Sequence, residues 1–313
     1  MDSSELQKIA QHARGTREAG TAIIVASALL TVFLFIPLAP KALPTVPVAV
    51  SAGPDAFAEV PLQAEAAIVY DLATKQTLFE KNADAQLPLA SLTKILTVYA
   101  ALTTLSPETP ITISAEAVRT EAPRAFNEGQ VFSLADLARL TLTASLNDGA
   151  VAIAEAAAER QNRSQNAMLA GAALALNLSQ TFAVNGSGLD VNASVSGSYG
   201  SARDLAVLAG ALVAEVPRIA AATTASSARA TSEGGTTFDV QNTDPMVGSL
   251  PRLLLSKTGY TELAGGNLAL VFDVGIHHPI AIIVLGSTQK ARFTDGTSLV
   301  AATLAHFAGL ASL

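Results

Sequence analysis

The sequence predicts an α+β domain in which both ends of the folded region supply strands to one antiparallel sheet. Apolar runs at 66–71 and 76–80 flank a short polar turn, as in a β-hairpin. Further apolar runs at 253–258, 267–273 and 279–285 predict three strands near the C-terminus. The residues between these two groups show mainly helical periodicity. We therefore expect a helical region inserted between the strands of a single sheet.

Composition narrows the range of partners. The 313 residues suffice for one large domain or two smaller ones with a substantial core. A net charge of -7 and a pI near 5.1 argue against the basic patch that marks nucleic-acid binding. The chain has no Cys, which excludes disulfides, thiolate catalysis and Cys-ligated zinc. We expect no nucleic-acid partner, no metal site and no cofactor.

An uncharged apolar run follows a polar N-terminal tail. Residues 1–18 form the tail, and residues 19–40 contain no charged side chain. About 20 such residues suffice to cross a bilayer, so this run predicts a transmembrane anchor. Lys and Arg are more frequent before the run than just after it, which places the N-terminus in the cytoplasm and the rest outside it. The alternative is a cleaved signal peptide, but both the tail and the run are long for one.

A proline-rich stretch at 41–62 reads as an extended linker, and the folded domain is expected to occupy 63–313. Ser133 and Ser201 each precede an acidic residue by three positions, a pattern typical of helix N-caps. The crowded Ala, Thr, Ser and Gly residues of 222–237 predict a loop. Helices are expected at 91–102, 137–142, 148–159, 202–213 and 299–307.

Ser91 and Lys94 open the helix at 91–102. Residues three apart lie on one helix face, so the hydroxyl and the amine should project side by side. This pairs a nucleophile with a possible base, at a helix N-terminus where developing negative charge is favoured. The Ser-x-x-Lys pattern occurs again at Ser287–Lys290, directly after a predicted strand, so the pattern by itself does not identify a site.

Two further motifs lie downstream. Lys257-Thr258-Gly259 is expected to end a buried strand, where Lys supplies positive potential, Thr a hydroxyl and Gly close approach for an anionic substrate. Ser145-Leu146-Asn147 precedes the helix at 148–159. A second Ser-x-Asn, at 164–166, lies in a polar stretch from which we expect no apolar helix to start.

Together and in this order, the three motifs resemble those of the active-site penicilloyl serine transferases, which include penicillin-binding proteins and serine β-lactamases. The nearest branch is the low-molecular-mass D-Ala-D-Ala carboxypeptidases. The similarity covers roughly residues 64–310 and includes Asn185-Gly186-Ser187-Gly188-Leu189-Asp190. It implies a β-lactamase/transpeptidase-like fold. Leu146 departs from the branch, which usually has Gly there, so the groove beside the nucleophile is expected to differ in shape.

The resemblance also implies roles for the first two motifs. Ser91 would attack the carbonyl between the two terminal D-alanines and form an acyl-enzyme. Lys94 would be the general base, which requires a neutral amine; burial and the nearby cation Lys257 are both expected to lower its pKa. Ser145, with Lys257, would pass the proton to the leaving nitrogen. Asn147 would hold the substrate amide.

By the same resemblance, the third motif would bind the substrate. The backbone N–H groups of Ser91 and Tyr260 would form the oxyanion hole. Thr258 and Arg292 would take the terminal carboxylate, and Gly259 would admit the substrate backbone. The alternative for Arg292 is an ordinary surface arginine.

The expected function is that of a serine-type D-Ala-D-Ala carboxypeptidase acting on peptidoglycan stem peptides and binding β-lactams covalently. It would be a single-pass protein of the bacterial cytoplasmic membrane, held by residues 19–40, with its catalytic domain outside. A DD-endopeptidase is the main alternative. A β-lactamase would need a Glu where Ala173 stands, and an inactive wall-binding homologue would not need the catalytic side chains. A Ser-His-Asp hydrolase finds no support, because the pair His277-His278 reads as a solvated turn.

Overall fold

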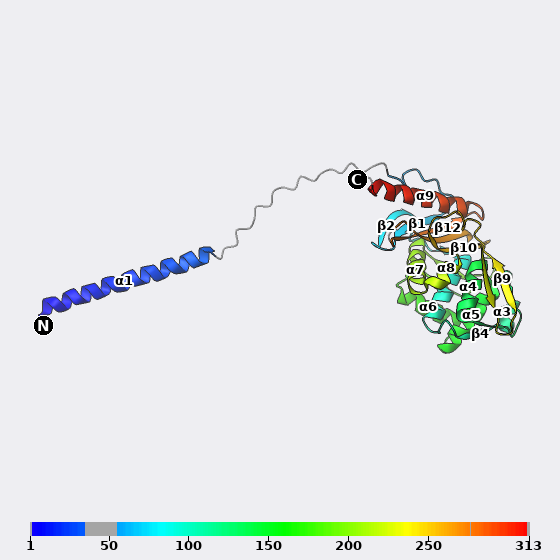
Figure 1. Cartoon of the computed structure of the whole chain (residues 1–313), viewed down its shortest axis with the longest axis horizontal. Helices are drawn as coiled ribbons and strands as arrows, with labels where there is room; N and C mark the ends of the chain where they lie inside the picture. The colour runs from blue at the N-terminus through cyan, green and yellow to red at the C-terminus, as the bar shows by residue number, and fades with distance from the viewer. Residues whose placement is uncertain (1, 35–54, 276, 312–313) are drawn as a thin grey trace. The chain divides into compact units, whose positions relative to one another are not determined.

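One antiparallel sheet organises the larger of two units in the computed structural model, which describes residues 2–34, 55–275 and 277–311. The strand order is β10-β11-β12-β1-β2, so strands from the two ends of the domain are neighbours (Figure 1). The register pairs Ala66 of β1 with Leu285 of β12. This confirms the predicted sheet. Its strands are β1 (Ala66–Asp71), β2 (Gln76–Lys81), β10 (Leu253–Thr261), β11 (Gly265–Asp273) and β12 (Pro279–Ser287).

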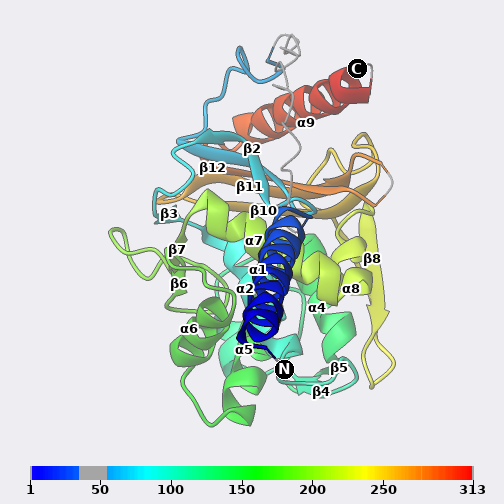
Figure 2. The same cartoon turned by 90° about the vertical axis from the view of Figure 1, so that its left-hand side faces the viewer.

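Each face of the sheet carries its own apolar layer. In β1, Ala66 and Ile68 face the helical region, whereas Ala67 and Val69 face α9 (Ala291–Ala311). Figure 2 shows α9 on one side of the sheet and α7 on the other. A strand buried on both faces needs apolar residues throughout, which explains the unbroken apolar run. Complete burial of a side chain such as Ile68 or Val69 stabilises the fold by roughly 1.5–3 kcal/mol.

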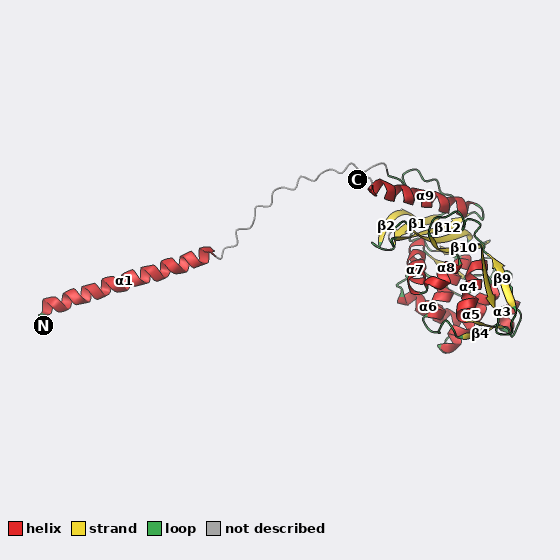
Figure 3. Ribbon diagram, viewed as in Figure 1, coloured by secondary structure: helices red, strands yellow, loops and turns green. Residues whose placement is uncertain are grey.

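The inserted region is helical, as predicted (Figure 3). Ser133 Oγ accepts the Asp136 N–H, and Ser201 Oγ accepts the Asp204 N–H, which confirms both N-caps. Its helices are α2 (Thr93–Leu102), α3 (Ala115–Arg119), α4 (Leu134–Ala144), α5 (Asn147–Arg160), α6 (Gln165–Ala175), α7 (Ala202–Glu215) and α8 (Pro217–Ala222), and a 3-10 turn, η1 (Ala90–Leu92), precedes α2.

Short strands complete the domain. They pair as β3 (Leu87–Pro88) with β7 (Ser198–Gly200), β7 with β6 (Phe182–Ala183), β4 (Pro110–Thr112) with β5 (Val131–Ser133), and β8 (Ser227–Thr231) with β9 (Thr237–Gln241).

Four local predictions are wrong. The expected loop at 222–237 contains β8, whose Ala228 and Ala230 alternate inward although they are too small to give an apolar signal. Ser164 does precede a helix, α6. The last helix begins at Ala291, eight residues earlier than expected. Lys257-Thr258-Gly259 lies within β10 rather than at its end, because pairing with β11 continues to Thr261.

The smaller unit, Met1–Ala52, contains α1 (Ser3–Leu34). Among the described residues, no helix combines the length and apolarity needed to cross a membrane. Residues 35–40 of the expected anchor and 41–54 of the expected linker lie outside the described residues. Phe57, which lies within the expected linker, is buried against the ring of Phe79.

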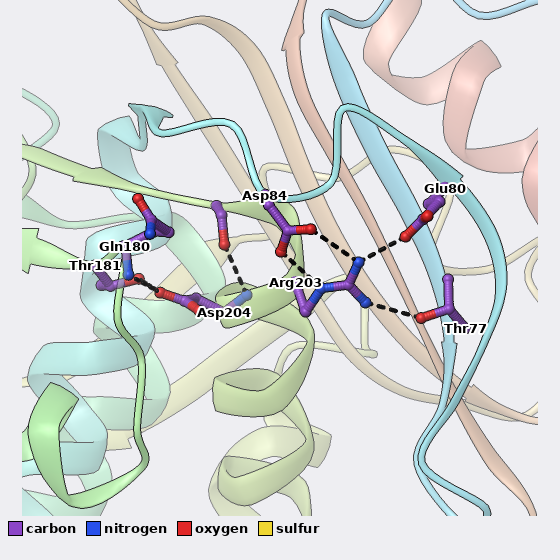
Figure 4. Close-up of polar contacts among 8 residues, drawn as sticks. Thr77, Glu80, Asp84, Gln180, Thr181, Arg203 and Asp204 are labelled. Atoms are coloured by element: carbon purple, nitrogen blue, oxygen red, sulfur yellow. Dashed lines mark hydrogen bonds and ion pairs between the residues drawn. The ribbon is translucent and has the colours of Figure 1, made fainter.

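Arg203, in the first turn of α7, ties three segments together (Figure 4). Its Nε donates to Asp84 Oδ1 at 2.7 Å, and its two terminal nitrogens donate to Thr77 and Glu80 of β2. The next residue, Asp204, accepts the Gln180 N–H and the Thr181 hydroxyl. The start of α7 therefore holds both the edge hairpin and the segment before β6.

We expect Arg203→Ala to lower the free energy of unfolding by about 1–2 kcal/mol, because a planar guanidinium loses a bidentate carboxylate and two further partners. Urea denaturation of the full chain measures the change. Arg229→Ala is the matched control, since the Arg229–Asp239 pair on the β8–β9 hairpin is largely exposed and should contribute almost nothing. Equal losses in the two variants would contradict the structural role of the Arg203 network.

Candidate active site

Ser91 lies in η1 at the start of α2, with its side chain next to that of Lys94. The Lys94 Nζ to Ser91 Oγ distance is 2.7 Å, which confirms that the two side chains meet. Ser91 is partly exposed, whereas Lys94 is completely buried. The preceding residue, Ala90, has a φ of 48°, a left-handed conformation that non-glycine residues rarely adopt. The chain is thus bent sharply just before the expected nucleophile.

The Lys94 amine is buried and surrounded by protein atoms. Its Nζ also lies 2.7 Å from Asn147 Oδ1 and 2.7 Å from the Ser187 carbonyl oxygen. Burial lowers the pKa of Lys94 to about 7, and the negative charge of buried Asp148 opposes the shift. Burial, the first of the two expected causes, is thus the main cause of the lowered pKa. Near neutral pH, a large fraction of Lys94 is neutral and able to accept a proton.

Ser145 and Lys257 form a second hydroxyl–amine pair. Ser145 ends α4 in a left-handed conformation, with φ 58°, and accepts a hydrogen bond from Lys257 Nζ at 2.9 Å. Lys257 lies on β10, completely buried, and also donates to the Thr258 carbonyl. Burial, followed by the positive charges of Lys94 and Arg292, holds the pKa of Lys257 well below its ordinary value.

Asn147 links this centre to the loop before β5. Its Nδ2 donates to the carbonyls of Glu121 and Ala122, and its Oδ1 faces Lys94. The adjacent Asp148 accepts the N–H groups of residues 125 and 126, each at 2.8 Å. The start of α5 therefore fixes both Lys94 and the neighbouring loop.

Gly259 brings β10 close to the turn that carries Ser91. A Cβ at this position would lie 3.2 Å from the Ser91 nitrogen and 3.0 Å from the Leu89 carbonyl oxygen. The missing side chain leaves the Ser91 N–H accessible beside the strand. Tyr260, the next residue, is 39% exposed. A cavity of about 550 Å³ adjoins Tyr260 and extends along the segments 189–193 and 260–263.

Arg292 is not a surface residue. It is 7% exposed, and one terminal nitrogen donates to the Gly259 carbonyl at 2.6 Å. Its Nε is buried and has no hydrogen-bond partner among the described residues. Thr258, also buried, shares a 2.6 Å hydrogen bond with Thr243. A buried cation with an unused donor is therefore located beside the third motif.

All nine candidate residues belong to one connected region formed by η1, α2, α5, the end of α4, β10 and α9. Sequence reasoning assigned no role to Thr243, Asp148 or the Ser187 carbonyl, although the motif at 185–190 was noted. The second Ser-x-x-Lys is separate: Ser287 Oγ donates to Asp295. His278 Nε2 lies 2.7 Å from buried Asp71, so the expected solvated turn is partly anchored.

The family model described as D-alanyl-D-alanine carboxypeptidase matches residues 53–288. The chain belongs to this family. It is therefore a serine peptidase and a low-molecular-mass penicillin-binding protein, as its similarity to D-alanyl-D-alanine carboxypeptidases indicates. Its fold is the mixed helix-and-sheet fold of penicillin-binding proteins and transpeptidases.

Two curated relatives of this peptidase differ in name. A D-alanyl-D-alanine endopeptidase of Pseudomonas aeruginosa is 30% identical over 283 residues, which cover 87% of this chain and 86% of the relative. A D-alanyl-D-alanine carboxypeptidase of Escherichia coli is 31% identical over 273 residues, which cover 79% of this chain and 64% of the relative.

Two solved structures share the fold of the peptidase. Penicillin-binding protein D2 of Listeria monocytogenes, in its ampicillin-bound form, is 26% identical with a TM-score of 0.66, over 77% of this chain and 97% of that one. A D-alanyl-D-alanine carboxypeptidase of Mycobacterium tuberculosis is 23% identical with a TM-score of 0.70, over 78% and 92%.

Proposed function

We propose that the peptidase removes the terminal D-Ala from peptidoglycan stem peptides through an acyl-enzyme on Ser91. The observation that carries this is the 2.7 Å contact between the Ser91 hydroxyl and a buried Lys94 whose pKa is near 7. A lysine with its ordinary pKa would hold its proton at neutral pH and could not act as a base.

Acylation begins when neutral Lys94 takes the Ser91 proton as Oγ attacks the carbonyl between the two D-alanines. The N–H groups of Ser91 and Tyr260 stabilise the negative charge that develops on the carbonyl oxygen. Ser145, hydrogen-bonded to Lys257, gives its proton to the leaving nitrogen, and D-Ala departs. The proton that Lys94 took from Ser91 then passes to Ser145, which leaves Lys94 neutral. Water attacks the ester, Lys94 accepts the proton of the water, and Lys94 returns this proton to Ser91 Oγ as the shortened peptide is released.

The terminal carboxylate of the peptide fits beside Thr258 and Arg292. The Thr258 hydroxyl supplies a donor, and the buried guanidinium of Arg292 supplies positive potential. Asn147 would hold the substrate amide only by exchanging one of its present partners, because both of its polar atoms are already bonded to protein.

We expect Arg292→Ala to lower kcat/KM on the order of 10- to 100-fold for peptides with a free terminal carboxylate, the effect of one lost charged hydrogen bond. The same peptide with an amidated C-terminus should show little change, and Arg292→Lys should recover part of the loss. Steady-state kinetics with the two peptides measure the difference. An equal loss for both would mean that Arg292 supports only the Gly259 backbone.

A DD-endopeptidase is the second candidate, favoured by the name of the Pseudomonas aeruginosa relative and by its 86% coverage. The two activities are separated by incubating the full chain with a stem pentapeptide and, in parallel, with a cross-linked peptide dimer. Carboxypeptidase activity releases free D-Ala from the pentapeptide. Endopeptidase activity converts dimer to monomers. We expect D-Ala release to be the faster reaction.

β-Lactams are expected to acylate Ser91. The Listeria monocytogenes protein was solved in ampicillin-bound and cefotaxime-bound forms. Labelling with a fluorescent penicillin, followed by peptide mapping, tests this for the present chain. A label on any residue other than Ser91, or no label on folded protein, would contradict the proposed nucleophile.

We also propose that residues 19–40 anchor the peptidase in the cytoplasmic membrane, with the catalytic domain outside. Support comes from the absence of charge in this run and from the excess of Lys and Arg before it. Membrane fractionation with a C-terminal reporter that is active only after export tests both points. Recovery of a shortened protein in the soluble exported fraction would instead support a cleaved signal peptide.

A further inference from the structure

The segment Asn185-Gly186-Ser187-Gly188-Leu189-Asp190, here the 185–190 turn, contacts two elements of the active site, α2 and β10. The Ser187 carbonyl accepts from Lys94 Nζ, and the Gly186 carbonyl accepts from Thr97 Oγ1 one helical turn further along α2, both at 2.7 Å. Asp190 accepts from the Thr261 hydroxyl at the end of β10. The turn therefore links the base helix to the strand that carries the third motif.

The contact with Ser187 has a consequence for the direction of the Lys94 lone pair. A neutral lysine amine has two N–H donors and one lone pair. Two of its three neighbours, the Ser187 carbonyl and Asn147 Oδ1, can only accept hydrogen bonds. Asn147 Oδ1 is identified as the oxygen because the other amide atom donates to two carbonyls. When both N–H groups face these acceptors, the lone pair faces Ser91, the remaining neighbour.

One side chain closes the turn. Asn185 Oδ1 accepts from the Ser187 N–H, the Ser187 hydroxyl and the Gly188 N–H at 3.2, 3.0 and 2.8 Å, and Nδ2 donates to the Leu189 carbonyl at 3.0 Å. Gly188 has a φ of 78°, and a Cβ there would lie 1.9 Å from the Ala90 carbonyl oxygen. The closed turn is thus packed against the bend that precedes the nucleophile.

We propose that Asn185 is a positioning residue, which closes the 185–190 turn and so holds the Ser187 carbonyl where it directs the Lys94 lone pair at Ser91. This inference rests on the proposed function of Ser91 and Lys94. The Ser187 carbonyl also stabilises the protonated amine, since hydrogen bonds from a charged donor are roughly twice as strong as neutral ones. Loosening the turn should therefore have two effects on acylation, on its maximal rate and on its pH dependence.

The test is the rate of Ser91 acylation by a fluorescent penicillin, measured against pH on the full chain. For Asn185→Ala we expect the plateau rate to fall on the order of 10- to 100-fold, because the base is less well oriented. The protonated amine of Lys94 should lose more stabilisation from the Ser187 carbonyl than the neutral amine loses, which lowers the pKa of Lys94. We therefore expect the acidic limb of the profile to move to lower pH by roughly half to one unit. A purely structural role would lower the plateau without moving this limb.

A matched control and a second variant complete the experiment. Asn166 Oδ1 likewise accepts a backbone N–H and a serine hydroxyl, at the exposed start of α6, so Asn166→Ala should behave like the unmodified chain. Thr97→Val removes only the hydroxyl that holds the Gly186 carbonyl and should give smaller changes of the same sign. If Asn185→Ala does not fold, the position of the acidic limb in Thr97→Val decides whether the 185–190 turn positions Lys94.

An acidic limb that stays in place in the folded variants would overturn the positioning role, whatever happens to the plateau. The unmodified chain separates this failure from that of the proposed function. If penicillin labels Ser91 in that chain and the limb does not move in the variants, only the role of Asn185 is wrong. If penicillin does not label Ser91 there, the proposed function itself fails.

Discussion

Ser91→Ala should abolish labelling by fluorescent penicillin and lower D-Ala release from a stem pentapeptide by at least about 10³-fold. Without Oγ no acyl-enzyme can form, and removal of a nucleophile costs orders of magnitude in kcat even when the rest of the site is intact. The partners of Lys94 other than Ser91 remain in place, so the fold should be preserved. Gel fluorescence and D-Ala assay measure the two losses, and circular dichroism verifies folding.

The chain supplies its own control for this prediction. Ser287 begins the second Ser-x-x-Lys pattern, yet its hydroxyl donates to Asp295 on α9. Ser287→Ala should lose some stability while keeping both labelling and D-Ala release. Covalent labelling that persists in Ser91→Ala and disappears in Ser287→Ala would show that the wrong copy of the motif was chosen.

Lys94→Met should lower the rate of Ser91 acylation by about 10²- to 10⁴-fold, the range for a lost general base. Met fills similar space without an amine. In the unmodified chain, acylation should fall about tenfold per pH unit below about 7, because the pKa of Lys94 is about 7 and only the neutral amine accepts the serine proton. Lowering the pH protonates Lys94, so the rate is lost on the acidic side.

Stopped-flow or timed-label measurements between pH 5 and pH 9 (roughly two units either side of the Lys94 pKa) give the profile. Lys290→Met, in the second Ser-x-x-Lys pattern, should leave both the rate and the profile unchanged, since Lys290 is exposed. A profile that remains flat down to pH 5 would mean that Lys94 is not the base. Retention of the rate in Lys94→Met would mean the same.

Much of the fold follows from local patterns. Strands β1, β11 and β12 of the main sheet carry long apolar runs, and hydroxyl side chains mark the starts of α4 and α7. The sequence did not predict the β8–β9 hairpin or α6, for two different reasons. The inward side chains of β8 are alanines, which give almost no periodic signal of hydrophobicity. The residues before α6 are polar, so the sequence did not indicate that a helix begins there. Small side chains are placed by the packing around them rather than by their own hydrophobicity.

The chemistry of the site divides in the same way. The sequence by itself determined which side chains could react, because spacing on one helix brings Ser91 to Lys94 and the order of three motifs indicates their partners. Only the tertiary structure decided that burial lowers the pKa of Lys94 to about 7, that Arg292 is buried, and that the Ser187 carbonyl accepts a hydrogen bond from Lys94. Burial and hydrogen-bond direction depend on residues far apart in the chain, such as Lys94 and Ser187, whose meeting no local pattern records.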